Sequence, residues 1–361
     1  MTDSIDFLVR RNDFTQTRWV EAQLRAGSAL EPGEVLLRVD RFGLTANNIT
    51  YGVVGDLMGY WNFFPAPEGW GRIPVWGFAD VVASRATGVQ GGDRVFGYLP
   101  ISTFLRVRAD RVTEQGFVDA SEHRRALPAV YQQFARARRT DPAKEDMRAL
   151  VSPLFATGFL IDDWLIEQGL FGARQVIFAS ASSKTALAAA SSMSRRSPRD
   201  FTVVGLTSAR NREFCERTGY YDRVVEYGQL SALPAATPAV LVDMASDAGV
   251  LHAVHGHFGA ALQYSCMVGM THQSSTFVAP AGLPGPAPQL FFAPGVIDAR
   301  RKSWGPDEFA KRLAGAQSAF IASMQPWFEL RHGRGPEEIE SAFRAVLGGR
   351  AEPHQGLILS F

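Results

Sequence analysis

A short polar turn at residues 179–185, ASASSKT, gathers hydroxyl groups and one cation between two apolar stretches. The run before it, 175–180, is typical of a buried strand, and the Ala-rich stretch after it, which ends at Met193, is typical of a helix. Unpaired backbone N–H groups at a helix N-terminus attract anions, and hydroxyl and ammonium groups add further donors. We therefore predict that a phosphate group contacts Ser180, Ser182, Ser183, Lys184 and Thr185.

Other interpretations of this turn stay open. It lacks the glycines of a dinucleotide-binding turn, so Ser182 could simply cap the helix while Lys184 is solvated. The tripeptide SKT is similar to the end of a P-loop, but that motif needs glycine where this chain has Phe178 and Ser183. An NTPase is therefore disfavoured. The choice lies between an altered dinucleotide site and an α/β unit without that ligand.

A second polar turn, 207–211, follows the apolar run 201–206. In a dinucleotide-binding unit the second strand ends near the adenosine ribose, where an Asp or Glu accepts hydrogen bonds from the ribose hydroxyls. This turn has no acidic residue and offers a cation and hydroxyl donors, which suit a 2′-phosphate. We predict NADP(H) rather than NAD(H), contacted by Thr207, Ser208 and Arg210, with Arg212 nearby. The alternative is an exposed helix start that carries an Arg.

The sequence HAVHGH at 252–257 contains three histidines but does not complete a metal site. His252 and His255 can share a helix face, while His257 points elsewhere. No Cys or carboxylate completes a ligand set with zinc spacing. We therefore predict that the protein holds no metal.

These turns belong to a chain whose first hundred residues are rich in expected strands and whose second half alternates strands with helices. Strand-like runs at 5–11, 18–24, 34–44, 74–84, 93–100 and 104–112 predict a small barrel-like β domain. Residues 119–150 are charged and helix-periodic, which predicts a helical insertion, and 154–171 predicts an apolar helix. Apolar runs at 175–180, 201–206, 222–227, 239–245, 261–269 and 289–294, most of them separated by helices, predict a parallel, doubly wound sheet. Helices at 306–331 and 336–347 and a closing strand, GLILSF, are expected to follow.

Composition narrows the class of protein. The 361 residues carry a formal net charge of +1, which gives no electrostatic case for nucleic acid or an anionic membrane. The N-terminus lacks the pattern of a signal peptide, and no apolar run approaches transmembrane length. We expect a cytoplasmic protein with a small-molecule substrate.

The order of these parts resembles the medium-chain dehydrogenase/reductase superfamily, in particular its zinc-free quinone and enoyl reductase branch. The motifs that carry the resemblance are PGEVLLRV (32–39), GVQGGDRVFG (88–97), RTGYYDRVVEY (217–227) and HQGLIL (354–359). The turn SSKTALAAA and the segments FFAP (291–294) and RRKSWGP (300–306) suggest a divergent subfamily of uncharacterised function. The resemblance implies a GroES-like β-barrel domain, 1–148 with 330–361, and a Rossmann-like dinucleotide-binding domain, 149–329.

The resemblance also implies site residues. The loop 45–65 corresponds to the substrate loop of the family, where Asn48 takes the place of a frequent Asp and Tyr60 lies near the position of the proton-donating Tyr of the enoyl reductases. A phenol can protonate the carbanion or enolate that follows hydride transfer. Tyr51 is the rival donor, and the alternative is that both tyrosines only line an apolar pocket or core. The nicotinamide is expected near Gly269 and Met270.

Together these features predict a zinc-independent, NADPH-dependent oxidoreductase that reduces an activated C=C or C=O bond of an enone, quinone or enoyl-type substrate. The resemblance adds a homodimer in which the strands between 261 and 294 could extend the sheet. The main alternative is a non-catalytic dinucleotide-binding or interaction protein that retained the fold. A further alternative is an enzyme that uses the same cleft for a different ligand, such as an acyl or phosphorylated metabolite.

Overall fold

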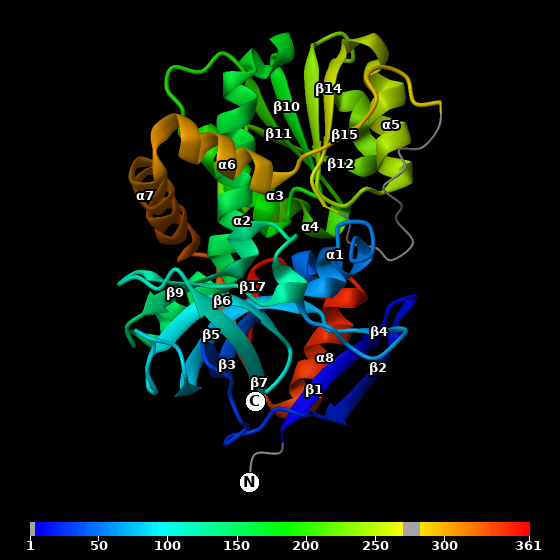
Figure 1. Cartoon of the computed structure of the whole chain (residues 1–361). Coiled ribbons are helices and arrows are strands. Elements are labelled where there is room, and N and C mark those ends of the chain that lie inside the picture. Colours follow the sequence, from blue (N-terminus) through cyan, green and yellow to red (C-terminus); the bar gives the residue numbers. More distant parts are fainter. Residues whose placement is uncertain (1–3, 270–281) are drawn as a thin grey trace. The chain divides into compact units, whose positions relative to one another are not determined.

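The computed structural model describes residues 4–269 and 282–361, which form two compact units that we treat separately (Figure 1). The barrel unit contains Met1–Leu150, Leu330–Ala351 and Gln355–Phe361. The α/β unit contains Val151–Glu329 and Glu352–His354. The division predicted from the sequence places its first boundary two residues earlier, at 148/149, and assigns 352–354 to the other unit.

A closed antiparallel barrel forms the centre of the barrel unit. Its strands follow one another in the order β3 (Glu34–Leu44), β5 (Pro74–Ser84), β6 (Arg94–Pro100), β9 (Gln133–Ala137), β8 (Gly116–Asp119) and β7 (Phe104–Asp110), and β7 pairs with β3 to close the ring. In β7 the buried Leu105 and Val107 alternate with the exposed Arg106 and Arg108. This alternation places one face of the strand in the core and the other in water.

Further elements extend the barrel unit. The strands β17 (Gln355–Ser360) and β16 (Glu329–Arg334) add to the same sheet beside β3. A separate three-stranded sheet contains β2 (Asp13–Glu21), β1 (Ile5–Arg10) and β4 (Trp70–Gly71). The helix α8 (Gly335–Leu347) packs against it, where the rings of Phe343 and Phe7 lie 5.2 Å apart. The loop expected at 45–65 contains the helix α1 (Ala46–Val53) and the 3₁₀ turn η1 (Tyr60–Phe63).

The predicted helical insertion at 119–150 is wrong for most of its length. The segment contains only the short 3₁₀ turns η2 (Glu122–Arg124) and η3 (Ala129–Gln132) before β9, which pairs with β6 and β8 and completes the barrel. Residues 133–137 form a strand despite their helical periodicity. Without this strand, the edges of β6 and β8 would have unpaired backbone groups. The α-helix of this region begins only at Pro142.

That helix, α2 (Pro142–Glu167), is one continuous element where the sequence suggested two helical segments. The sequence predicted that no apolar run approaches transmembrane length. By length and composition alone, however, α2 is long and apolar enough to cross a membrane. Within the most apolar window of α2, 56% is buried inside the protein.

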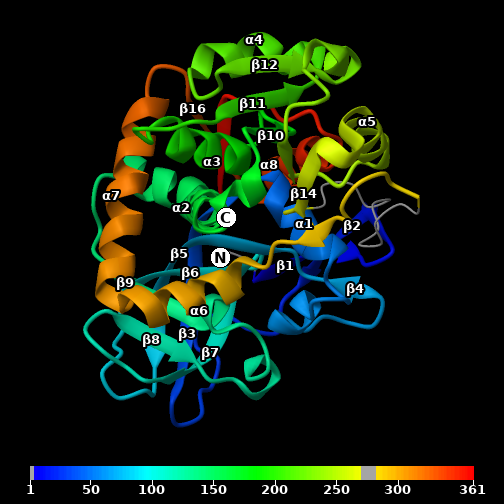
Figure 2. The same cartoon turned by 90° about the horizontal axis from the view of Figure 1, so that it is seen from above.

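A parallel six-stranded sheet is the core of the α/β unit (Figure 2). Its order is β12 (Arg223–Glu226), β11 (Thr202–Thr207), β10 (Gln175–Ala179), β13 (Ala239–Asp243), β14 (Leu262–Met267) and β15 (Gln289–Leu290), and every adjacent pair is parallel. All residues of β10 are buried, since helices cover both faces of the sheet. The predicted Rossmann-like sheet and GroES-like barrel are both confirmed.

Helices on the two faces connect these strands. The helix α5 (Ala248–Phe258) buries Leu251 and Val254 against Ile177 and Leu241 on one face. In Figure 2 α3 (Lys184–Ser194) lies on the other side of β10 from α5. The remaining helices are α4 (Ala209–Thr218), α6 (Ala293–Trp304) and α7 (Pro306–Met324), with short 3₁₀ turns η4 (Gly169–Gly172), η5 (Tyr227–Ala232) and η6 (Gly259–Ala261). The strand predicted at 289–294 is shorter than expected, because Pro294 lies in the first turn of α6, where proline is compatible with a helix start.

Candidate functional site

The strand order of the α/β unit fixes where a ligand can bind. The chain runs from β10 through β11 to β12 on one side and then returns to β13 on the other side of β10. The carboxyl ends of β10 and β13 therefore flank the point at which the strand order reverses. Open parallel sheets bind ligands in the crevice at this point. The turn at 179–185 lies there, as the sequence predicts.

The second residue of this turn, Ser180, takes a backbone conformation that glycine normally supplies. Ser180 has φ +55°, in the left-handed region, which costs a non-glycine residue roughly 1–2 kcal/mol. Its N–H donates to the phenol oxygen of Tyr227 at 3.1 Å. Within the same turn, Ser183 N–H donates to the carbonyl of Ser180 at 2.8 Å. The geometry of a glycine turn is thus present without its glycine.

Ser183, not Ser182, caps the helix. Its Oγ accepts from Ala186 N–H at 3.3 Å, which satisfies one unpaired donor of the first turn. Ser182 Oγ instead accepts from the side-chain amide of Asn211 at 3.0 Å and so joins this turn to the start of α4. Its own O–H is left to donate.

Three backbone donors of the turn have no protein acceptor. Within the part of the chain that the structure describes, the N–H groups of Ser182, Lys184 and Thr185 make no hydrogen bond to another residue. These groups surround the N-terminus of α3, an 11-residue helix whose dipole favours an anion there. The turn therefore offers free donors to a ligand.

Lys184 adds an uncompensated charge. Its ammonium is half-buried, lies 3.4 Å from the carbonyl oxygen of Pro353 and sits 5.5 Å from the ring centre of Phe328. Across the described residues it forms no ion pair with a carboxylate. Burial lowers the pKa of Lys184 from 10.5 to about 8. An anionic ligand would stabilise the ammonium form and supply the missing counter-charge.

Arg210 of the second turn and the neighbouring Arg212 both have carboxylate partners. Arg210 pairs with Glu352. Arg212 pairs with Glu216 at 2.9 Å and with Glu226 at 3.2 Å. A 2′-phosphate at this turn would have to compete with these carboxylates.

The two predicted hydroxyl donors of the second turn differ in access. Thr207 is 1% exposed, and its hydroxyl hydrogen-bonds with the thiol of Cys215, so it is poorly placed for a ligand. Ser208 is half-buried at the start of α4 and makes no side-chain cap. Ser208 is therefore the more available of the two.

A buried acid lies at the end of β13. One oxygen of Asp243 accepts from Ala245 N–H at 3.1 Å, and the other has no hydrogen-bond partner among the described residues. Burial raises the pKa of Asp243 to about 6. Nearby, Ser246 Oγ donates to the carbonyl of Gly269 at 2.8 Å. Gly269 is thus placed beside the end of β13, whereas Met270 lies outside the described residues.

In the barrel unit, Asn48 is held by backbone groups. Its Oδ1 accepts from Thr45 N–H at 2.7 Å, and its Nδ2 donates to the carbonyl of Pro74 at 2.8 Å. Both ends of the amide therefore secure α1 and its contact with β5. This geometry favours a structural role, and catalysis by Asn48 stays a prediction.

Tyr51 and Tyr60 lie in an aromatic cluster of the same unit. Tyr60 Oη lies 3.0 Å from Tyr131 Oη, and Tyr51 Oη accepts from Trp76 Nε1 at 3.2 Å. Tyr51 also hydrogen-bonds with Asn47 and Tyr131, so Tyr131 joins the two predicted donors. Burial raises the pKa of Tyr51 and of Tyr60. Both phenols are nearly inaccessible, at 7% and 6% exposure, which fits the core alternative as well as the donor prediction.

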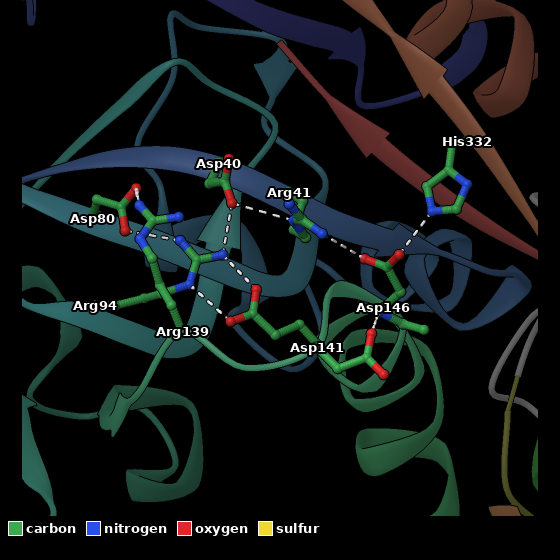
Figure 3. A network of polar contacts seen from close by, with 10 residues as sticks. Asp40, Arg41, Asp80, Arg94, Arg139, Asp141, Asp146 and His332 are labelled. Carbon is green, nitrogen blue, oxygen red and sulfur yellow. Dashed lines mark hydrogen bonds and ion pairs between the residues drawn. The ribbon is translucent and has the colours of Figure 1, made fainter.

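A network of ion pairs in the barrel unit is centred on Arg94 (Figure 3). This guanidinium is 2% exposed and donates to Glu145 through two nitrogens, at 3.2 and 2.7 Å. It also donates to Asp80 at 2.8 Å and to Asp40 at 2.6 Å. Burial alone would raise the pKa of Asp40, but the hydrogen bond and charge of Arg94 hold it below its usual value.

The cluster continues to the surface. Arg41 bridges Asp40 and Asp146, at 3.2 and 3.1 Å, and His332 contacts Asp146 at 2.7 Å (Figure 3). Every cation drawn there has a carboxylate partner. The cluster links β3, β5 and β6 to the first turn of α2, which indicates a structural role.

The three histidines of 252–257 are separately engaged. His255 lies between Pro284 O and Ser265 Oγ, at 2.8 and 2.9 Å, and His257 contacts Leu233 O at 2.9 Å. His252 contacts Ala248 O within its own helix. Over residues 4–269 and 282–361, no group of three or more His, Cys, Asp or Glu side chains could hold a metal ion.

Sequence reasoning missed several residues of these sites. Tyr227, Asn211 and Glu352 contact the predicted turns, and Tyr131 joins the predicted tyrosines. Tyr227 ends the motif RTGYYDRVVEY, so its position after the third strand of the sheet was a usable signal. Nothing in the sequence connects Glu352 with Arg210, because 141 residues separate them.

Solved structures share this fold. CurA from Vibrio vulnificus in complex with NADPH has a TM-score of 0.64 at 12% identity, over 99% of this chain and 98% of that chain. A mutant form of enoyl thioester reductase from Candida tropicalis has a TM-score of 0.55 at 10% identity, over 100% of both chains. The yhdH oxidoreductase from Salmonella enterica in complex with NADP has a TM-score of 0.52 at 12% identity, over 99% of both chains. The expected medium-chain reductase fold is confirmed.

Sequence comparison identifies a family. Residues 42–352 match the family described as "Protein of unknown function (DUF2855)". No curated protein matches the sequence.

Proposed function

This chain belongs to the DUF2855 family and has the fold of the medium-chain reductases, and from that premise we propose that it is an NADPH-dependent oxidoreductase. The substrate class we propose is a small molecule with an activated C=C or C=O bond, such as an enone, a quinone or an enoyl thioester. The proposal includes no metal. A homodimer and a cytoplasmic location stay predictions.

The observation that carries the proposal is the uncompensated charge of Lys184 at the switch point of the sheet. Free N–H groups of Ser182, Lys184 and Thr185 surround the same helix end. Similar structures are described as complexes with NADPH and with NADP. A pyrophosphate needs several donors at close range together with positive charge.

The residues present fit such a group. Ser182 and Thr185 can donate from their hydroxyls, and Lys184 supplies the charge that no carboxylate of the described chain provides. Tyr227 already occupies the Ser180 N–H, so that donor is excluded from the set.

When bound, NADPH supplies a hydride, and the chain must then supply a proton. A phenol with a raised pKa keeps its proton in water-like conditions and releases it only to a strong base such as an enolate. Tyr51 is better placed than Tyr60 for this role, because Trp76 N–H and Asn47 hydrogen-bond with its oxygen and would stabilise the phenolate. We therefore favour Tyr51 as the donor.

Ligand titration tests the proposal. Purified protein is titrated with NADPH and NADH while nucleotide fluorescence and the melting temperature are recorded. We expect a saturable NADPH response and a weaker NADH response. A chain that responds to neither nucleotide would sink the reductase proposal and favour the interaction-protein alternative.

Turnover tests the chemistry. NADPH oxidation is followed at 340 nm (the usual nicotinamide band) with a panel of enones, quinones and enoyl thioesters. Tyr51→Phe is expected to lower kcat by about 100-fold, whereas Tyr60→Phe, the matched control in the same cluster, changes it little. The reverse ranking would restore Tyr60 as the donor. Saturable NADPH binding without turnover of any substrate would favour a non-catalytic dinucleotide-binding protein.

A further inference from the structure

One short segment, Glu352–His354, contacts both cations that the sequence assigns to phosphate binding. Glu352 pairs with Arg210, and the carbonyl of Pro353 lies 3.4 Å from the ammonium of Lys184. The segment belongs to the α/β unit, although the residues on both sides of it belong to the barrel unit. The carbonyl of His354 accepts from Glu329 N–H at 2.9 Å, which ties the segment to the same unit.

These contacts resemble what a ligand would make. Arg210 is bound by a carboxylate and Lys184 by a carbonyl oxygen. A phosphate can replace both acceptors with its own anionic oxygens, which form charge-assisted hydrogen bonds. Both contacts are weak. The Arg210 and Glu352 side chains are 57% and 41% exposed, and exposed ion pairs of this kind contribute little to stability.

We propose that Glu352–His354 is an internal competitor for phosphate, and that Glu352 sets the selectivity of the site for a nucleotide that carries a 2′-phosphate. This inference rests on the proposed nucleotide function. In the ligand-free protein the segment neutralises Arg210 and partly satisfies Lys184. A phosphorylated ligand gains their donors only by displacing those acceptors, so the segment lowers affinity without closing the site.

The position of Arg210 determines which phosphate is affected. It lies in the turn after β11, where the adenosine ribose of a dinucleotide is found. The Glu352 carboxylate therefore opposes a 2′-phosphate directly, whereas it opposes a ribose with free hydroxyls much less. Its removal should favour 2′-phosphorylated ligands selectively.

The experiment compares Glu352→Gln with the wild-type chain. The probes are 2′,5′-ADP and 5′-AMP, which differ by the 2′-phosphate, together with NADPH and NADH, and binding is measured by calorimetry. We expect the Kd of 2′,5′-ADP and of NADPH to fall about threefold to fivefold, as the loss of a competing exposed ion pair implies. The Kd of 5′-AMP and NADH should change less than twofold.

The chain offers a matched control. Glu308 is also 41% exposed, and it pairs with Arg312 on α7 at 2.7 Å. Glu308→Gln removes the same charge and a similar ion pair away from β10 and β11, so it should leave all four Kd values unchanged. An equal gain in Glu308→Gln would mean that net charge alone is responsible and would overturn the inference.

A double variant tests whether the effect of Glu352 on binding acts through Arg210. In an Arg210→Gln background, Glu352→Gln should give no further gain for 2′,5′-ADP, because the cation that it would release is absent. A gain that persists there contradicts the inference. Saturable NADPH binding that is unchanged in Glu352→Gln overturns the competitor but leaves the proposed function standing. If no nucleotide binds any variant, both fail.

Discussion

Arg94 in the barrel unit is a buried cation and Lys184 in the α/β unit is a half-buried one, and their surroundings differ. Arg94 donates to three carboxylates, Glu145, Asp80 and Asp40. Lys184 has one long contact to a carbonyl and no carboxylate within the described ranges. Burying a cation costs desolvation free energy unless a carboxylate pairs with it. In the barrel unit, carboxylates of the protein itself compensate the charge of Arg94. In the α/β unit the charge of Lys184 stays uncompensated until a ligand supplies the counter-charge.

The two cations show how a ligand site differs from a structural ion cluster. Charge that is fully compensated inside the protein supports structure, as in the cluster of Arg94, Arg41 and their acids (Figure 3). Charge that is left uncompensated beside free backbone donors is available for binding. The two kinds of site should respond to mutation in opposite ways.

The largest expected effect is on stability, in Arg94→Met. It removes the cation that Glu145, Asp80 and Asp40 share, although Arg139 still pairs with Asp80 and Arg41 with Asp40, so the free energy of unfolding should fall by about 3–5 kcal/mol. Urea denaturation of the variant measures the loss. Arg312→Met, which breaks an exposed pair, should cost less than about 1 kcal/mol. A loss in Arg94→Met no larger than in this control would mean that the cluster is not structural.

The next effect is on binding, in Lys184→Met. A charge-assisted hydrogen bond contributes about 1.5–3 kcal/mol, so NADPH affinity should fall at least about tenfold. Stability in urea should stay the same or rise, because an unpaired ammonium is removed from a half-buried position. If Lys184→Met destabilises the chain as much as Arg94→Met, the contrast between the two cations is wrong.

The pH dependence of NADPH affinity tests the role of the unpaired Lys184. Free Lys184 loses its proton as pH rises through about 8, and an anion binds the ammonium form more tightly. NADPH affinity should therefore fall above pH 8, by up to about tenfold per pH unit. In the ligand-free protein, the contribution of Lys184 to folding stability changes with pH in the opposite direction. Between about 8 and 10.5 the unfolded state holds the additional proton, so this residue's contribution to stability rises with pH.

Lys184→Arg is the control for that titration. A guanidinium stays charged across the range, so its NADPH affinity should be flat from pH 7 to 9.5, in an isothermal titration series. A wild-type affinity that is equally flat would show that Lys184 does not hold the phosphate.

The smallest expected effect is in Arg212→Gln. Arg212 is held by Glu216 and Glu226, so it resembles Arg94 more than Lys184 although it lies near the predicted ribose site. NADPH affinity measured by fluorescence titration should change less than about twofold. A loss as large as that of Lys184→Met would mean that a paired cation can also bind the ligand.

Much of the fold could be predicted from local sequence patterns. The strands β3 and β5 have the predicted bounds, because turn residues flank long branched runs on each side. β9 was not predicted, since QFARA is short and lies in a charged, helix-periodic segment. Its pairing depends on the edges of β6 and β8, which are distant in the sequence.

The candidate site was predictable only where it is local. The turn 179–185 could be located from a strand followed by a helix, and Lys184 from its charge at the helix start. The partners that decide the role of each residue come from distant segments. Thr207 faces Cys215, Arg210 meets Glu352 and Tyr51 meets Trp76 and Tyr131. Such contacts depend on tertiary packing, which periodicity and turn chemistry do not encode.

The left-handed backbone of Ser180 has a consequence for how relatives of this protein are found. Glycine fingerprints are written as letters, but the turn requires a torsion angle, and here a serine meets that requirement at an energetic cost. A search that scores letters passes over such a turn. A search that scores backbone angles at the end of the first parallel strand would retrieve it, together with other chains in which a serine has taken the same place.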